Sequence, residues 1–403
     1  MTKDLDHTNT TKISSTIEIA GSKSESNRLL ILQKLYPNLV IQNLSNSDDT
    51  KYLQKALASN KELADIAHAG TAMRFLTALF AIQQGKTHIL TGSKRMQNRP
   101  IEVLVTALQD LGATIQYVEK KGFPPLKIIG KKITHNKVSV AGNISSQYIT
   151  ALLLIASKLP NGLRLKLLGE IMSTPYINMT LGLLNSIGIK TARNKDEITV
   201  FPLDNIKTQT LNVAPDWSSA SYFYSLVALH QKARIKLKGF DKDSLQGDIA
   251  LVKIYKKLGV NTIFDSNSIT LAPIKGFNFK AISLNLNSTP DLAQTIAVTC
   301  LGLGIDCHLE GLHTLKIKET DRLIALKNEL EKLGAKVSIT TTSLTLKSPK
   351  KINTNISIAT YQDHRMAMAF APLSVCVPIK IENADVVSKS YPNFWIDWEI
   401  LFC

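Results

Sequence analysis

Long apolar stretches are absent from this 403-residue sequence. No run reaches about 18 apolar residues, whereas a membrane-spanning helix needs roughly 20. The first residues, MTKDLDHTNTTKISS, lack the apolar core that secretory signals have. We therefore expect a cytoplasmic protein with no membrane partner.

Cysteine is also scarce. The chain has four, which are Cys300, Cys307, Cys376 and Cys403. None stands in a CxxC spacing, and three lie in or beside apolar segments. Zinc sites and disulfide frameworks use closely spaced or numerous cysteines, so neither is indicated. This pattern favours a reducing compartment.

Aromatic residues make up 6% of the chain, and acidic residues are fewer than basic ones. Forty-eight Lys and Arg against 32 Asp and Glu give a formal net charge of +16, which favours nucleic acid, a membrane surface or small anions as partners. The lysines are mostly single, and no run contains five like charges. An RNA-binding repeat protein, an alternative from another class, would interleave arginine with stacking aromatics. We therefore expect small anionic substrates and no nucleic acid.

A polar residue followed by a long apolar helix recurs along the chain. The six predicted helix starts are Ser24, Thr71, Ser146, Ser219, Asp291 and His364. After a first interval of 47 residues, the intervals are 75, 73, 72 and 73 residues. A second series, Gly112, Gly188, Gly259 and Gly334, ends further helices before β-branched segments, where a left-handed cap is typical. The sequence therefore predicts a repeated unit of about 73 residues.

Each predicted unit contains two helices and several strands, which indicates an α+β fold. Six such units are too many for a single core of ordinary size. We therefore expect two domains of three repeated α/β units each. One consists of residues 1–20 and 214–403, and the other of residues 21–213. The short first interval predicts that residues 1–20 pair elsewhere.

The segment Gly21–Arg28, GSKSESNR, precedes an apolar run and predicts a loop that enters a helix. Uncovered backbone N–H groups at a helix start favour an anion, and Lys23 and Arg28 add two cations. The segment is therefore a candidate phosphate or carboxylate site, although a serine-capped helix would also explain it.

Ten phrases, taken together, carry a resemblance to a known family. They are GSKSESNR, HAGTAMRF (68–75), RMQNRPI (95–101), SSQYITALL (145–153), STPYI (173–177), DWSSASYF (216–223), PDLAQT (290–295), KETDRL (318–323), DHRMAMAF (363–370) and SKSYPNF (388–394). The chain resembles the 5-enolpyruvylshikimate-3-phosphate synthase family along essentially its whole length. The resemblance implies two domains with a pseudo-threefold arrangement of repeats, an active site in the cleft between the domains, and induced fit.

The resemblance also implies a reaction. The enolpyruvyl group of phosphoenolpyruvate is transferred to the 5-hydroxyl of shikimate 3-phosphate, through a tetrahedral intermediate that then loses phosphate. Such chemistry needs an acid for the methylene carbon and a base for the hydroxyl. It implies no metal, no other cofactor and no covalent enzyme intermediate, and we expect a monomer that binds two small molecules.

Site residues follow by resemblance. The catalytic residues are Lys23, Asp291 and Glu319. The residues that bind shikimate 3-phosphate are Lys23, Ser24, Arg28, Ser145, Ser146, Gln147, Ser173, Tyr176, Asp291 and Lys318. The residues that bind phosphoenolpyruvate are Lys23, Gly70, Arg95, Gln147, Arg322, Arg365 and Lys389.

Other residues in these phrases receive plainer interpretations. Arg99 is interpreted as a surface or packing residue, and the segment 216–219 as a helix cap. His68, Phe75 and Thr314 depart from residues common in the family.

The sister family that acts on UDP-N-acetylglucosamine is the nearest alternative. It usually carries a reactive cysteine in the loop before the Arg-Pro pair. The segment 91–100 has none, and the intact KETDRL and DHRMAMAF phrases favour shikimate 3-phosphate.

Overall fold

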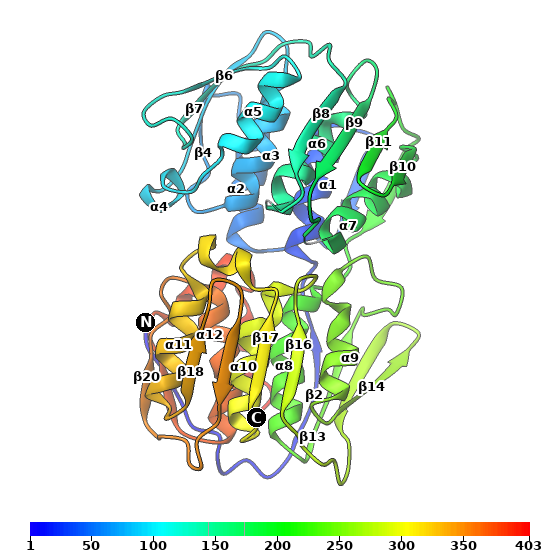
Figure 1. Ribbon diagram of the computed structural model, residues 1–403. Coiled ribbons are helices and arrows are strands. Elements are labelled where there is room, and N and C mark those ends of the chain that lie inside the picture. The colour runs from blue at the N-terminus through cyan, green and yellow to red at the C-terminus, as the bar shows by residue number, and fades with distance from the viewer. Residues whose placement is uncertain (144, 173) are drawn as a thin grey trace. The chain divides into compact units, whose positions relative to one another are not determined.

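The computed structural model describes residues 1–143, 145–172 and 174–403 (Figure 1). The chain forms two compact units. Residues 21–213 form what we call the central unit, and residues 1–20 with 214–403 form the terminal unit. Each unit buries its own hydrophobic core. Among the described residues, no helix is long and apolar enough to cross a membrane.

The central unit contains three sheets among its described residues, ordered β12-β3, β4-β5-β7-β6 and β10-β11-β9-β8. Its strands are β3 (Leu39–Gln42), β4 (Leu63–Asp65), β5 (Thr87–Thr91), β6 (Thr114–Tyr117), β7 (Leu126–Ile129), β8 (Lys137–Ala141), β9 (Leu163–Leu168), β10 (Thr191–Asn194), β11 (Glu197–Val200) and β12 (Gln209–Asn212). Its helices are α1 (Lys23–Leu35), α2 (Asp48–Ala58), α3 (Gly70–Ala81), α4 (Lys94–Gln97), α5 (Glu102–Asp110), α6 (Ser146–Ala156) and α7 (Thr174–Ser186).

The terminal unit also contains three sheets, ordered β1-β21-β20, β14-β15-β13-β2 and β16-β17-β19-β18. Its strands are β1 (Lys3–Leu5), β2 (Ile13–Glu18), β13 (Ala233–Lys238), β14 (Val260–Asp265), β15 (Ser268–Pro273), β16 (Ile282–Asn285), β17 (Cys307–Glu310), β18 (Lys336–Ile339), β19 (Leu344–Lys347), β20 (Ile356–Ile358) and β21 (Ile379–Ile381). Its helices are α8 (Trp217–Leu229), η1 (Gly247–Ala250), α9 (Leu251–Lys256), η2 (Pro290–Leu292), α10 (Ala293–Gly302), η3 (His313–Ile317), α11 (Arg322–Lys332), α12 (His364–Phe370), η4 (Ala371–Val375), η5 (Ala384–Lys389) and α13 (Phe394–Glu399).

One strand arrangement recurs in all four of the four-stranded sheets. In each, two parallel strands are joined by a helix or a long crossover, and two antiparallel strands follow at one edge. The strand β2 supplies the parallel partner of β13, from Ile13 opposite Ala233 to Glu18 opposite Lys238. The expectation that residues 1–20 pair elsewhere in the chain is therefore confirmed.

The repeat is also visible in side-chain contacts of α10, which packs against both α8 and α12 (Figure 1). The Ser221 Oγ–Thr295 Oγ1 and Ser225 Oγ–Thr299 Oγ1 pairs each join residues 74 positions apart, at 3.2 and 2.7 Å. Corresponding positions of successive repeats thus meet directly. The predicted α+β fold built from repeated units is confirmed.

Helix boundaries agree closely with the predicted starts. The glycines of the second series all have left-handed backbone angles, with φ of 106° at Gly112, 89° at Gly188, 79° at Gly259 and 96° at Gly334. Helix α6 is buried from Tyr148 to Ala156 because it is apolar on every side, as expected of a helix inside a core. The inner helices α1, α3 and α6 make contact pairwise, so their polar first turns are held by a rigid core.

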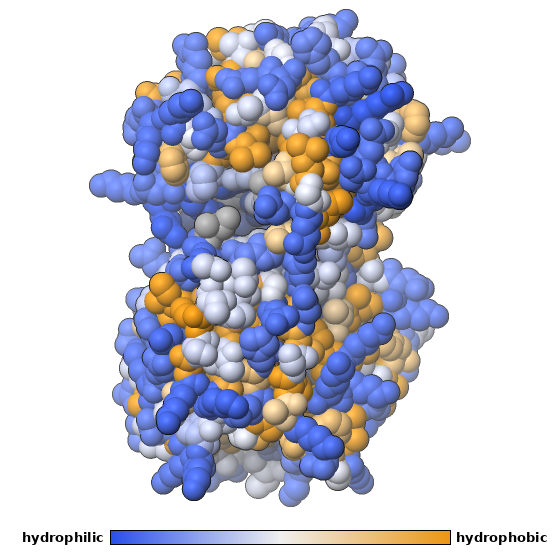
Figure 2. All heavy atoms as spheres, viewed as in Figure 1, coloured by the Kyte–Doolittle hydropathy of each residue, from blue (hydrophilic) through white to orange (hydrophobic). Residues whose placement is uncertain are grey.

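Hydrophilic side chains are spread over the visible face of each unit in Figure 2, with smaller apolar patches between them. Hydrophilic residues are therefore not gathered into a single stripe on this face.

Candidate active site

Asp291 is the centre of a charged cluster in the terminal unit. Its carboxylate lies 2.8 Å from Arg322 Nη1, 3.3 Å from Lys318 Nζ and 3.4 Å from Arg365 Nη2. Burial alone would raise the pKa of Asp291, but the cations, Lys318 foremost, hold it well below its usual range. Asp291 therefore stays ionised. Thr289 stands at the N-cap position of η2, two residues before Asp291.

Arg322 is fully buried among three carboxylates. Its Nε donates to Asp363 Oδ2 at 2.6 Å, its Nη1 to Asp291 Oδ1 at 2.8 Å and its Nη2 to Glu319 Oε2 at 2.8 Å. Burial lowers the pKa of Arg322, but Asp363 and the other two carboxylates outweigh it and raise the pKa. The Arg322 guanidinium thus fixes the positions of Asp291 and Glu319 relative to each other.

Lys318 follows η3 and Lys389 ends η5, both beside this cluster. Burial lowers the pKa of Lys318, although Asp291 opposes that effect. Lys389 Nζ donates to the carbonyl oxygen of Gln362 at 2.8 Å, just before Asp363 caps α12. Thr314 lies buried in η3, and its Oγ1 has no hydrogen-bond partner in the described structure.

The start of α8 differs from the predicted plain cap. Asp216 stands at the N-cap position, but its carboxylate accepts from Ser219 Oγ at 2.8 Å instead of from the backbone. The backbone N–H of Trp217 donates to Gln246 Oε1 at 2.8 Å. Ser218 Oγ donates to Asp248 and accepts from Arg365 Nη2 at 3.3 Å. Ser218 therefore belongs to the charged cluster.

A second cluster forms in the central unit around the first turn of α1. Lys23 Nζ lies 3.3 Å from Asp49 Oδ2, in the first turn of α2. Ser24 precedes Arg28 by one turn, and Arg28 Nη1 donates to the Ser24 carbonyl at 2.7 Å. The predicted loop and helix start are thus brought together with a carboxylate that the sequence left without a role.

Arg28 lies between two aromatic rings. Its guanidinium is 5.7 Å from the Phe75 ring centroid and 5.9 Å from that of Tyr176. The Nε also donates to Thr180 Oγ1 at 2.9 Å. Burial lowers the pKa of Arg28 to about 10, which leaves it charged at neutral pH. The aromatic residue at position 75, which departs from the family pattern, therefore packs beside a predicted substrate ligand.

The serine phrase lies at the start of α6. Ser145 is the N-cap and accepts from the Gln147 backbone N–H at 3.4 Å, while Gln147 Nε2 donates to Thr71 Oγ1 at 3.4 Å. Ser145, Ser146 and Gln147 are all partly exposed, so these polar groups remain open to a ligand. Ser173 lies outside the described residues.

Gly70 begins α3, and its neighbour is Arg99. A Cβ at Gly70 would lie 2.4 Å from Arg99 Nη1, so any larger residue would displace that guanidinium from its present position. Arg99 Nε is buried and has no hydrogen-bond partner among the described residues. Arg95, the residue that the sequence favoured, is exposed on the short helix α4. The structure therefore places the Arg99 guanidinium beside Gly70.

Sequence reasoning missed Asp248, Gln246 and Asp363 as well as Arg99. Asp363 is fully buried and both caps α12 and binds Arg322. A usable signal existed, because Asp363 and Arg99 stand inside the resemblance phrases. Gln246 and Asp248 form the phrase QGD, which lies outside them.

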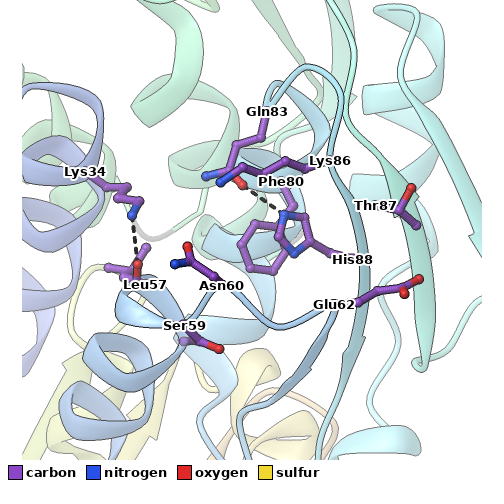
Figure 3. A pocket seen from close by; sticks show the side chains of 11 residues that line it. Lys34, Leu57, Ser59, Asn60, Glu62, Phe80, Gln83, Lys86, Thr87 and His88 are labelled. Carbon is purple, nitrogen blue, oxygen red and sulfur yellow. Dashed lines mark hydrogen bonds between the residues drawn. The ribbon is translucent and has the colours of Figure 1, made fainter.

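Figure 3 shows a separate hollow of about 360 Å³ in the central unit, between the ends of α1, α2 and α3. His88 stacks on Phe80 there with ring centroids 3.8 Å apart, and its Nε2 lies 2.9 Å from Gln83 Oε1. Lys34 donates to the Leu57 carbonyl. No predicted site residue lines this hollow, so its residues can serve as controls.

Both clusters suit chemistry on anions that requires proton transfer. The terminal unit combines an ionised carboxylate with a second carboxylate, Glu319, and three cations. The central unit offers helix N-termini, hydroxyls and two buried or half-buried arginines. Partly buried cations bind phosphate and carboxylate groups more strongly than exposed ones do.

Comparison with known proteins gives consistent matches. The family model for EPSP synthase (3-phosphoshikimate 1-carboxyvinyltransferase) matches residues 53–398. A 3-phosphoshikimate 1-carboxyvinyltransferase of Bacteroides fragilis strain YCH46 is 44% identical over 390 residues, covering 96% of this chain and 95% of that protein. A protein of the same name from Shewanella pealeana is 35% identical, covering 95% and 96%.

Solved structures show the same fold. The EPSP synthase of Acinetobacter baumannii matches with a TM-score of 0.77 at 19% identity, covering 100% of this chain and 98% of that one. The enolpyruvyl transferase NikO of Streptomyces tendae matches with a TM-score of 0.76 at 12% identity, covering 99% and 96%.

Proposed function

The chain belongs to the EPSP synthase (3-phosphoshikimate 1-carboxyvinyltransferase) family, and we infer from this membership how its two clusters share the reaction. The protein is a transferase. It moves the enolpyruvyl group of phosphoenolpyruvate to the 5-hydroxyl of shikimate 3-phosphate and releases phosphate, a step of the shikimate pathway.

The observation that supports the residue roles best is the arrangement around Asp291. A carboxylate held ionised by Lys318, Arg322 and Arg365 can accept the proton of a hydroxyl group, which is the base that the addition step needs. We assign this role to Asp291. Lys318, which contacts the same Asp291 oxygen as Arg322 does, would bind shikimate 3-phosphate beside Asp291.

Glu319 is the proposed acid for the methylene carbon of phosphoenolpyruvate. Its carboxylate is partly exposed, and its Oε2 lies 2.8 Å from Arg322 Nη2. Asp291 binds the other terminal nitrogen of the same guanidinium, Nη1. Addition turns the methylene into a methyl group, and elimination removes a proton from it again. Lys23, whose ammonium group lies near Asp49, is the third proposed proton-transfer residue.

The hydroxyl and N–H groups at the helix starts of the central unit are the proposed site for shikimate 3-phosphate. Ser24 and Arg28 lie on α1, and Ser145, Ser146 and Gln147 lie at the start of α6. Helix N-termini favour anions, and serine hydroxyls adapt to phosphate oxygens. Tyr176, in the first turn of α7, and Ser173 stay predicted ligands of the same substrate.

Cations of both units are proposed to bind phosphoenolpyruvate. In the terminal unit these are Arg322, Arg365 and Lys389. In the central unit, Lys23, Gly70, Arg95 and Gln147 keep their predicted roles. We propose that Arg99, beside Gly70, is a further ligand.

A direct test compares two arginines of one phrase. Arg95→Ala should raise the KM for phosphoenolpyruvate about 10- to 100-fold, because a charge-assisted contact contributes roughly 1.5 to 3 kcal/mol. Arg99→Ala, an equal loss of charge, should raise that KM by a similar factor if its guanidinium also binds this substrate. A KM within about threefold of the wild-type value would remove the arginine concerned from the proposed site.

The reaction itself is tested by phosphate release. Purified protein should release phosphate only when shikimate 3-phosphate and phosphoenolpyruvate are both present, and a chelator should leave the rate unchanged. His88→Ala, in the hollow of Figure 3, serves as a control that should keep this activity. Release with UDP-N-acetylglucosamine, or dependence on a divalent metal, would contradict the assignment.

We further propose that the protein works as a cytoplasmic monomer and binds no nucleic acid. The support is the scattered distribution of lysines and the low aromatic content, which suit small anions better than a nucleic-acid groove.

A further inference from the structure

Asp248 is a buried carboxylate with no assigned role. It lies in η1, directly after the phrase Gln246-Gly247, and is 5% exposed. Its loop is fixed to the start of α8, because Gln246 Oε1 accepts from the Trp217 N–H and Gln246 Nε2 donates to the Pro215 carbonyl, each at 2.8 Å. The carboxylate is therefore held at one place in the terminal unit.

A chain of hydrogen bonds runs from Asp248 to the charged cluster. Ser218 Oγ donates to Asp248 Oδ2 and accepts from Arg365 Nη2 at 3.3 Å. Arg365 Nη1 in turn donates to the Asp291 carbonyl at 3.2 Å, and Nη2 lies 3.4 Å from Asp291 Oδ2. A single hydroxyl group, that of Ser218, thus separates Asp248 from the Arg365 guanidinium, to which the proposed function assigns phosphoenolpyruvate binding.

The hydroxyl of Ser218 makes this chain sensitive to the charge on Asp248. An ionised carboxylate only accepts, so it turns the Ser218 proton towards itself and leaves a lone pair for Arg365. A protonated carboxyl group can donate to the same oxygen, which then gives less electron density to the bond from Arg365. The ionised form of Asp248 therefore holds Arg365 more firmly than the protonated form does, while the bonds from Arg365 to Asp291 remain in both.

The groups around Asp248 determine its pKa. Burial raises its pKa to about 6, while Arg365 and the Ser218 hydroxyl oppose the rise, and Asp291 and Asp216 add to it. On the following helix α9, Lys253 and Lys256 are exposed. Asp291, by contrast, stays ionised far below this range, so the two carboxylates titrate separately.

We propose that Asp248 is a positioning residue of the enolpyruvyl transfer, which through Ser218 holds Arg365 in place to bind phosphoenolpyruvate. This inference rests on the proposed role of Arg365. Asp248 touches neither substrate, and its loss acts through the guanidinium.

The test uses the pH dependence of kcat/KM for phosphoenolpyruvate. Asp248→Asn keeps the shape and the acceptor oxygen but cannot ionise. At pH 8 this variant should be about tenfold less active than the wild type, roughly the effect of a hydrogen bond to a charged group. At pH 5 the two should be nearly equal, because the wild type is then protonated too. Ionisation of the substrates affects both proteins alike and cancels in the ratio.

Two further variants keep the test sharp. Asp243→Asn changes an exposed carboxylate of the same loop and should match the wild type at every pH. Ser218→Ala should show the same pattern as Asp248→Asn, with about a tenfold loss relative to the wild type at pH 8 and little loss at pH 5. Circular dichroism checks that each variant is folded.

The decisive quantity is the ratio of kcat/KM between the wild type and Asp248→Asn. A ratio that stays constant from pH 5 to pH 8 would overturn the positioning role. A wild type that releases no phosphate at any pH would overturn the reaction assignment itself.

Discussion

Replacing Asp291 by asparagine should lower kcat roughly 10²- to 10⁴-fold, since that is the usual contribution of a positioned acid or base. The amide has nearly the shape of the carboxylate but no basicity. It also leaves Lys318, Arg322 and Arg365 without their shared negative charge. The measurement is single-turnover phosphate release with both substrates saturating, so that the loss is assigned to the chemical step and not to binding.

A matched control is Asp306→Asn. Asp306 lies in the same unit and pairs with Lys347 Nζ at 2.8 Å, but it is far more exposed and belongs to no site cluster. Because an exposed pair contributes roughly 0 to 1 kcal/mol to stability, this variant should keep its kcat. The Asp291 variant itself must be shown to be folded, because removing one partner of a buried ion pair can cost about 3 to 5 kcal/mol. A folded variant with near-normal kcat would refute the role of Asp291 as the base.

Glu319→Gln is expected to have the second large effect, a fall in kcat of roughly 10²-fold or more with little change in either KM. Glutamine can still accept from Arg322 Nη2 but has no exchangeable carboxyl proton for the methylene carbon. In deuterated water the wild type should introduce deuterium into the enolpyruvyl methylene group, because addition and elimination exchange its protons. In the variant, the rate of deuterium incorporation should fall by the same factor as kcat.

Glu331→Gln is the corresponding control on the same helix. Glu331 lies on α11 and its Oε1 is 3.9 Å from Lys327 Nζ, in an exposed pair one turn apart. This change should leave both the turnover and the deuterium exchange as they are. If Glu319→Gln keeps normal exchange, another group donates the proton.

The fold could be predicted well because its signals are local. A capping residue, an apolar helix and a glycine with positive φ recur within each repeat, and each acts through neighbours in the chain. Gly112 and Gly334 illustrate this, with φ of 106° and 96° where a left-handed cap was predicted. Their conformation does not depend on distant partners.

The site was predicted less completely, because its contacts are long-range. Arg95 and Arg99 are cations of one phrase, and only tertiary packing against Gly70 distinguishes them. Asp248 gives no periodic signal, since a single buried carboxylate gains its role from Ser218 and Arg365.

The pairing of β2 with β13 has a consequence for how the chain folds during synthesis. The central unit is continuous from residue 21 to residue 213, so all of its sheets can close once that stretch has left the ribosome. The terminal unit cannot do so, because Ile13 pairs with Ala233 and Lys3 with Ile381. Its strands β1 and β2 are synthesised first, and they stay unpaired until β21 and β13 have been synthesised. Both are short and rich in charged or hydroxyl side chains, KDL and ISSTIE, a composition that discourages pairing with other nascent chains during the delay.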